Sequence, residues 1–330
     1  MKSEIEIGLE GRLFNNSITF DVNYYDNTST DQIFAVPVAA SSGYTSKLMN
    51  AGSIKNSGIE IQLGGRLFDM DGFTADLNVN WSKNVSEVVS LAEGVENIYI
   101  NGFTGSQIRA VAGKPYGTIF GGKWARDSSN NRIIGANGYP VVSAEEGELG
   151  NINPDWIAGT RLTLGYQGVT VSALLDIKQG GVMWNGTRGA LVNYGVAKET
   201  ENRGTLTVFE GGRQVNGTWV KNDTAVPLSQ AWYLGNGGGF GNQAEEFVED
   251  ASYVRLRELT VSYDLPSSML EGSMLSRIGF SFTGRNLWLS TPYTGIDPET
   301  SLIGNGNGQG MDYFQFPNTK SYVFSLNLGF

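Results

Sequence analysis

The sequence predicts an all-β protein, and more specifically the C-terminal part of an antiparallel transmembrane β-barrel with about nine strands and long extracellular loops. Three observations predict this fold. Runs of about ten residues alternate between apolar and polar side chains, and the connections between them alternate between short and long. No apolar segment approaches the roughly 20 residues that a membrane-spanning helix needs.

The C-terminal run shows the alternation in its cleanest form. Between Ser321 and Phe330 every second side chain is apolar. A strand of about ten residues with this period can cross a bilayer at a tilt, with one face in lipid and the other in a polar lumen. The apolar positions, including the aromatic C-terminus, are Tyr322, Phe324, Leu326, Leu328 and Phe330.

The same pattern recurs along the chain. From Phe73 to Trp81 the odd positions are apolar and the even ones polar, and from Val169 to Ile177 only Leu174 breaks the alternation. A soluble sheet can also alternate, but the repetition favours a barrel. We expect strands at 4–13, 17–26, 56–66, 73–82, 156–166, 169–178, 251–264, 276–288 and 321–330.

The seventh of these runs changes phase part of the way along. Val254 and Leu256 lie on the opposite parity from the later apolar residues of the run. Either a β-bulge switches the phase, or the first part of the strand stands above the bilayer with both faces wet. We expect Arg255 and Arg257 to pair with acidic neighbours such as Glu258; the alternative is that they contact a plug or ligand in the lumen.

The connections between the runs fall into two classes. Links such as Asn15-Asn16 and Gln167-Gly168 are very short, which in bacterial outer-membrane barrels is typical of the periplasmic side. This parity places Phe330 in the periplasm and makes the first predicted strand run inward, which requires an earlier strand. The long connections, expected outside the cell, lie at roughly 27–55, 85–154, 179–250 and 289–319.

Composition agrees with a membrane barrel and argues against several other classes of protein. Charged residues make up 17% of the chain, below the roughly 25% of an ordinary globular domain. The chain contains no cysteine and no histidine, so thiolate and imidazole ligands are unavailable and the usual general base is missing. A net charge of −10 argues against a nucleic-acid partner. We expect no metal ion and no cofactor.

A series of short motifs in a specific order resembles the SusC/RagA-type TonB-linked outer-membrane receptors of Bacteroidetes. Each motif alone is weak, but their order and spacing together are specific. They are the segments at 50–60 (NAGSIKNSGIE), 150–156 (GNINPDW), 177–181 (IKQGG), 250–257 (DASYVRLR), 284–288 (GRNLW), 293–299 (YTGIDPE) and 316–322 (FPNTKSY), followed by the terminal Phe330.

The resemblance implies both a fold and a function. The family's chain is similar to a 22-stranded barrel with a plug and further N-terminal domains, so residues 1–330 are expected to be the C-terminal portion of that barrel without these parts. It implies import of oligosaccharides or peptides across the bacterial outer membrane, with a SusD-like surface lipoprotein as partner and with TonB acting through the N-terminal part. It also implies that Tyr322, Phe324, Leu326, Leu328 and Phe330 form the signal for the barrel-assembly machinery.

Aromatic residues in the long connections are candidate ligand contacts. Exposed rings bind sugars or peptides at little entropy cost, although they also serve as interface girdles or pack within loops. The candidates are Trp184, Tyr194, Trp219, Trp232, Tyr233, Tyr293, Tyr313 and Phe314.

The sequence leaves other functions open besides TonB-dependent import. A passive porin would share the strand pattern, and a soluble or surface β-sandwich could bind ligands without transport. An enzyme would need catalytic groups, and paired carboxylates hydrolyse glycosides. The acidic pairs at Glu145-Glu146 and Glu245-Glu246 are expected instead to be solvated loop residues, so we expect no enzyme activity.

Overall fold

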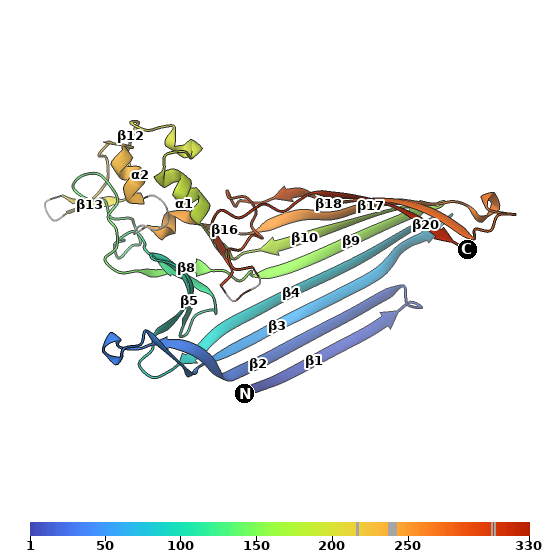
Figure 1. The fold of residues 1–330 in the computed structure, drawn as a ribbon, viewed down its shortest axis with the longest axis horizontal. Helices are drawn as coiled ribbons and strands as arrows, with labels where there is room; N and C mark the ends of the chain where they lie inside the picture. Colours follow the sequence, from blue (N-terminus) through green and yellow to red (C-terminus); the bar gives the residue numbers. More distant parts are fainter. Residues whose placement is uncertain (216–217, 237–242, 305, 307) are drawn as a thin grey trace.

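The nine predicted strands form one antiparallel sheet in chain order, which confirms the predicted fold class. The computed structural model of the protein describes residues 1–215, 218–236, 243–304, 306 and 308–330. Figure 1 shows the strands side by side, with the short turns at one end of the sheet and the long loops at the other. In order they are β1 (Lys2–Leu13), β2 (Ile18–Pro37), β3 (Ser46–Met70), β4 (Phe73–Leu91), β9 (Trp156–Tyr166), β10 (Val169–Gln179), β17 (Tyr253–Asp264), β18 (Arg277–Ser290) and β20 (Ser321–Gly329).

Three strands extend far beyond their predicted spans. Most of the segment 27–55, which we expected to be a loop, is a continuation of β2 and β3. The two strands stay paired up to Pro37 and Ser46, and a single 3-10 turn, η1 (Ala40–Ser42), lies at the tip of the hairpin. The expectation of a loop was wrong because alternation stops at residue 26 while strand pairing does not.

Apolar packing explains why the hairpin continues. Val36 and Ala51 are buried against Val88 of β4 and against Ile98 and Ala110 of the segments that follow it. This small core stabilises the part of β2, β3 and β4 that lies beyond the ends of the shorter strands.

Residues that pair from one strand to the next form rows across the whole sheet, and the side chains within a row have similar polarity. One row contains only apolar side chains and glycine, and the row one residue away is mainly polar. The first row is Leu13, Ile18, Gly65, Leu77, Leu162, Ala173, Leu259, Gly284 and Tyr322. The second row is Arg12, Thr19, Gly64, Asn78, Arg161, Leu174, Glu258, Arg285 and Ser321.

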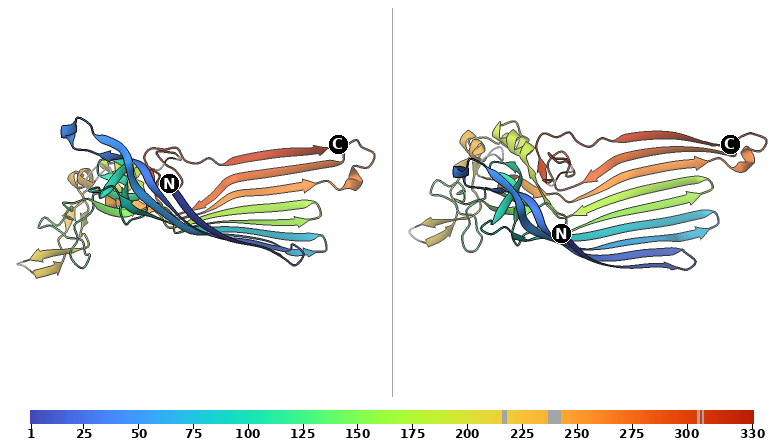
Figure 2. Two further views of the ribbon diagram at one scale, coloured as in Figure 1. Left: turned by 90° about the horizontal axis from the view of Figure 1, so that it is seen from below. Right: turned by 60° about the horizontal axis from the view of Figure 1, so that its bottom comes forward.

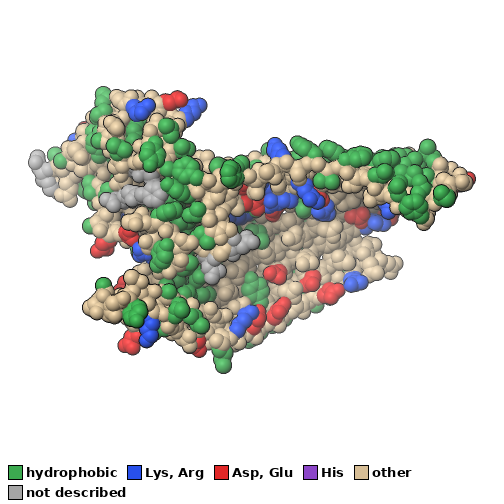
Figure 3. Space-filling model, in the orientation of Figure 1, with side chains coloured by type: hydrophobic (Ala, Val, Ile, Leu, Met, Phe, Trp, Pro, Cys, Tyr) green, Lys and Arg blue, Asp and Glu red, His purple; other side chains and the backbone are tan. Residues whose placement is uncertain are grey.

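The two faces of the sheet therefore differ in chemistry. The sheet curves into a trough (Figure 2), and charged side chains line its inside (Figure 3). A hollow of about 560 Å³ on this polar face is lined by Asn78, Asn80 and Arg161 among others. On the other face large apolar side chains are exposed, including Leu9, Phe282 and Phe324.

The tight turns at the short-loop end follow from local sequence. In Asp71-Gly72 and in Gln167-Gly168 both residues have positive φ. Two-residue hairpin links need this left-handed conformation, and glycine adopts it without steric cost.

A β-bulge accounts for the phase change in β17. Leu256 pairs with Leu175 of β10, but Glu258 pairs with the preceding residue, Leu174, so Arg257 is the extra residue of the bulge. The bulge brings Leu256 onto the same face as Leu259. Of the two explanations offered by the sequence, the bulge is confirmed.

The long connections fold together into a layer at one end of the sheet, which we call the loop cap (92–155, 180–252 and 291–320). Its β5–β8 segments form a four-stranded sheet, and two short helices lie above it (Figure 1). Its elements are β5 (Asn97–Phe103), β6 (Ser106–Val111), β7 (Thr118–Gly121), β8 (Gly147–Asn151), β11 (Val182–Asn185), α1 (Gly186–Asn193), η2 (Lys198–Thr200), β12 (Leu206–Thr207), β13 (Gly212–Val215), β14 (Thr218–Lys221), β15 (Val226–Pro227), α2 (Gln230–Asn236), η3 (Ala244–Phe247), β16 (Val248–Asp250) and β19 (Met311–Asp312). A further 3-10 turn, η4 (Ser267–Met269), lies in the link between β17 and β18.

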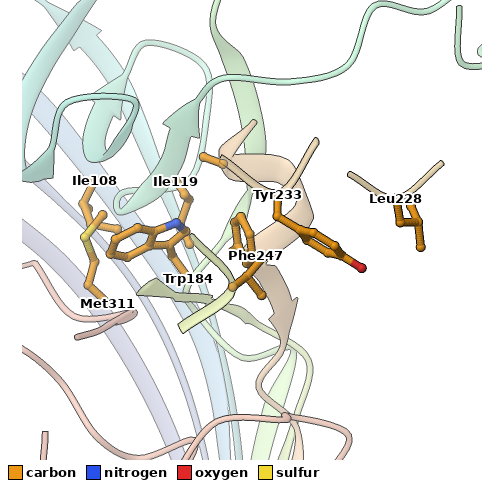
Figure 4. Close-up of a cluster of buried hydrophobic side chains, with 9 residues drawn as sticks. Ile108, Ile119, Trp184, Leu228, Tyr233, Phe247 and Met311 are labelled. Atoms are coloured by element: carbon orange, nitrogen blue, oxygen red, sulfur yellow. The ribbon is translucent and has the colours of Figure 1, made fainter. Parts of the chain in front are cut away.

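The loop cap has an apolar core of its own. Ile108 and Ile119 come from the first long connection, Trp184 and Phe247 from the second, and Met311 from the third (Figure 4). All five side chains are buried. The three connections therefore pack against one another and form a single unit. Within the described residues, no helix is long and apolar enough to cross a membrane.

Leu77 and Asn78, neighbours on β4 that lie in the two opposite rows, test the assignment of the two faces. If the apolar face meets lipid, Leu77→Arg should lower folding stability in a bilayer by about 2–4 kcal/mol near the midplane, whereas Asn78→Arg should be much milder. Refolding of the full-length protein into lipid vesicles measures both. Equal effects of the two substitutions would contradict the assignment.

Candidate functional site

Two arginines of β17 fasten the third long connection to the polar face of the sheet. Arg255 is buried, and its Nη2 lies 2.7 Å from Asp297 Oδ1. Its Nε lies 2.9 Å from Glu299 Oε2, close enough for an ion pair but not aligned for a hydrogen bond. Arg257 pairs with Glu299 at 2.8 Å and with Asp176 of β10. We call these five residues the ionic clasp.

The clasp corrects one expectation about the arginines. They pair with acidic side chains, but the partners come from the loop cap and from β10 rather than from Glu258. Glu258 instead lies 3.2 Å from Arg161 and 3.2 Å from Arg285, within the polar row. The sequence contained both sets of charges, but only the fold decides which of them meet.

The environment of Glu299 keeps it ionised. Burial favours the neutral acid, but hydrogen bonds from Arg257 and the charge of Arg255 outweigh burial, so the pKa of Glu299 lies below its ordinary value. Glu299 also lines a cavity of about 280 Å³ together with Tyr253 and Lys178. The clasp therefore lies where the loop cap meets the inside of the trough.

A second set of polar contacts joins the second and third long connections. Asp312 is fully buried and accepts hydrogen bonds from Tyr293 Oη at 2.7 Å and from Thr187 Oγ1 at 2.9 Å. Burial and the bond to this carboxylate raise the pKa of Tyr293, so it remains a donor at neutral pH.

Glu249 makes the third contact of this kind. Its carboxylate accepts hydrogen bonds from the Thr294 backbone N–H at 2.7 Å and from Arg188 at 3.2 Å. Arg188 in turn holds Glu199 with two hydrogen bonds of 2.8 and 2.9 Å. Loops 180–252 and 291–320 are thereby linked by charge-assisted bonds as well as by the apolar core.

Three of the four residues in the two acidic pairs of the loop cap form ion pairs. Glu146 lies 2.8 Å from Arg109, Glu246 lies 3.0 Å from Arg132, and Glu245 contacts Arg126. These three carboxylates therefore have cationic partners, which the sequence did not predict, whereas Glu145 is exposed as expected. In the part of the chain that the structure describes, no three acidic, histidine or cysteine side chains gather as metal ligands would.

The eight candidate aromatic residues divide into buried and exposed groups. Trp184, Tyr233 and Tyr293 are buried. Trp232 and Tyr313 are partly buried; Trp232 stacks on Trp124 at 6.0 Å between ring centroids. These five rings pack within the loops, which was the alternative that the sequence left open.

The other three rings are accessible. Tyr194 at the end of α1 is 76% exposed, Phe314 is 53% exposed and Trp219 on β14 is 37% exposed. They lie on separate elements, so the structure does not bring them together as one site. Accessible rings of this kind remain the ligand candidates.

The five C-terminal apolar residues share one face of β20. Phe324 pairs with Phe282 and Leu326 with Phe280 on β18, and Tyr322 stacks on Phe282 at 6.0 Å. Tyr322, Phe324, Leu326, Leu328 and Phe330 are all exposed, the last at 87%. The strand therefore ends the sheet with an uncovered apolar face.

One cavity was not anticipated from the sequence. A hollow of about 490 Å³ lies between the end of α1 and the start of α2, and Tyr194 is the one candidate ring exposed at its edge. Its other polar groups, among them Arg203, carry no sequence motif, because residues distant in the chain meet only through the helix packing.

Asp297→Asn tests whether the ionic clasp holds the third connection in place. The substitution removes one of the two carboxylates that pair with buried Arg255 and leaves Glu299, so the loss of stability should be smaller than the roughly 3–5 kcal/mol of a fully unpaired buried charge. Amide hydrogen exchange of residues 291–304 in the full-length protein should accelerate. The control is Asp69→Asn, which removes an exposed partner of Arg66 and should change little. Unchanged exchange in the Asp297 variant would contradict this role.

Comparisons with known proteins agree with this architecture. The family model described as "TonB dependent receptor-like, beta-barrel" matches residues 3–287. TonB-dependent receptor P26 of Formosa agariphila is 27% identical, with 99% of this chain and 34% of the relative covered. TonB-dependent receptor SusC of Bacteroides thetaiotaomicron is 20% identical, with 98% and 31% covered. The chain thus spans about a third of the length of these relatives.

A solved structure shows the same fold. The "RagAB peptide transporter" superposes with a TM-score of 0.73 at 23% identity, covering 99% of this chain and 35% of that one. Together with SusC among the relatives, this confirms the resemblance found in the sequence motifs. With a family model matched over most of its length, the chain belongs to the TonB dependent receptor-like β-barrel family.

Proposed function

We propose that the chain forms the wall and outer loops of an importer in the bacterial outer membrane, which takes up oligosaccharides or peptides with energy delivered through TonB. The observation that supports this most strongly is the pair of adjacent rows across all nine strands, one made of apolar side chains and glycine, the other mainly polar and on the inside of the trough. A barrel wall between lipid and a wet lumen needs this arrangement.

The exposed apolar face argues against the soluble β-sandwich alternative. Soluble proteins rarely expose large contiguous apolar patches, whereas here such side chains follow one face from β1 to β20. Family membership favours an energised importer over a passive porin. We infer a transport protein without enzyme activity.

Ligand and partner are expected at the loop cap. The relatives include SusC, and one similar structure is named a peptide transporter, RagAB. We propose that a SusD-like lipoprotein docks on the cap and that exposed rings there contact ligand. Coupling to TonB is assigned to the N-terminal part of the full-length protein.

The C-terminal strand has a different role in this proposal. Its exposed apolar residues, ending at Phe330, form the signal that the barrel-assembly machinery recognises.

Alanine substitutions at the exposed rings test the role of the cap. Replacing Tyr194, Trp219 and Phe314 together in the full-length receptor should weaken ligand or lipoprotein binding by about 1 kcal/mol or more, roughly fivefold in Kd, while surface levels stay normal. Phe14→Ala, an exposed ring at the opposite end of the sheet, is the matched control. Binding equal to that of the unaltered receptor would exclude these rings as contacts.

A change at the terminal residue tests the assembly role. Phe330→Ala should reduce the amount of folded receptor in the outer membrane without altering the ligand affinity of the assembled fraction. Asn327→Ala, on the opposite face of the same strand, should leave the amount unchanged. Quantified heat-modifiability on gels measures folded barrel, and a normal yield of the Phe330 variant would count against the signal.

A further inference from the structure

The cavity between α1 and α2 has the size and the composition of a small-ligand site. Its volume of about 490 Å³ falls within the roughly 300–1,000 Å³ typical of such sites. Val192, Leu228 and Tyr233 line it, and all three belong to the buried core of the loop cap; Figure 4 labels Leu228 and Tyr233. The core holds this apolar part of the lining in place, whereas Tyr194, Arg203 and Gln230 are exposed at its rim.

Arg203 provides a cationic group that nothing else in the described chain neutralises. Every other arginine forms an ion pair with a carboxylate, whereas the described residues offer none to Arg203. The nearby Glu199 is already occupied by both hydrogen bonds from Arg188. Arg203 is exposed, so its guanidinium is accessible and can bind a planar anionic group with two parallel hydrogen bonds.

The position of Arg203 depends on a glycine. Gly195 follows α1 with φ +68°, and a Cβ added there would lie 2.9 Å from Arg203 Nη1. The absence of a side chain lets the guanidinium lie against the end of the helix and beside the cavity.

The remaining polar groups suit a sugar. The ring of Tyr194 is 76% exposed next to Gly195 and offers a flat face to the C–H side of a pyranose. The side-chain amides of Asn193 and Gln230 also line the cavity and can donate to and accept from hydroxyl groups. A peptide bound by strand addition would need an exposed strand edge, and no strand residue lines the cavity.

We propose that this cavity binds an acidic saccharide, with a uronate carboxylate or a sulfate ester on Arg203, the sugar ring on Tyr194 and hydroxyls on Asn193 and Gln230. The chain carries a net charge of −10, so its overall field disfavours anions and selection for the acidic group falls on Arg203. This inference deepens the proposed import function by naming a substrate class, and it depends on that function only for the step from binding to uptake.

Binding to purified full-length receptor in detergent tests the proposal. The ligands are tetragalacturonate and a sulfated galactan tetrasaccharide, each measured by calorimetry beside its neutral form, methyl-esterified or desulfated. One acidic saccharide should bind at least tenfold more tightly than its neutral form. Arg203→Gln should abolish that difference, Arg203→Lys should restore part of it, and Tyr194→Ala should weaken the acidic and neutral forms by the same factor.

Controls separate this inference from its alternatives. Arg213→Gln removes a cap arginine that is paired with Asp223 and should leave binding unchanged. Absence of a preference for either acidic saccharide overturns the proposal, and so does Arg203-dependent binding of a tetrapeptide that is lost when its C-terminus is amidated. Loss of TonB-dependent uptake of every nutrient tested, with saccharide binding intact, would refute the import function but not the site.

Discussion

The register of a single antiparallel ladder determines most of this structure. For a sheet that faces lipid, every backbone N–H and C=O must pair with a neighbouring strand, because hydrocarbon offers no other partner. Side chains alternate with a period of two, so a slip of one residue would turn Leu77 inward and Asn78 outward. The rows through these two residues keep their character across all nine strands, and the bulge at Arg257 preserves it where the sequence changes phase.

Strand positions could be predicted from sequence because their cause is local. The alternation from Phe73 to Trp81 and from Ser321 to Phe330 separates a polar face from an apolar face within each run. All nine predicted runs are strands. The extension of β2 and β3 could not be predicted in this way. Residues 27–55 do not alternate, and their pairing depends on Val36 and Ala51 meeting Val88.

The candidate site depends on contacts between residues far apart in the chain, so the sequence predicted less of it. Exposed Tyr194 and buried Tyr233 look alike in the sequence, and only the packing of the cap separates them. Asp297 and Glu299, the partners of Arg255 and Arg257 in the loop cap, lie about forty residues further along the chain and meet the arginines because the third connection folds back over the sheet. A single sequence offers no local signal for such pairings.

The separate core of the loop cap has an evolutionary consequence. The residues that pack around Trp184 and Phe247 are distinct from those in the alternating rows. Mutations that reshape the cap surface can therefore accumulate without shifting the register of the strands, and a strand mutation need not alter the cap surface. Selection can therefore change the surface of the cap and the pairing of the strands separately.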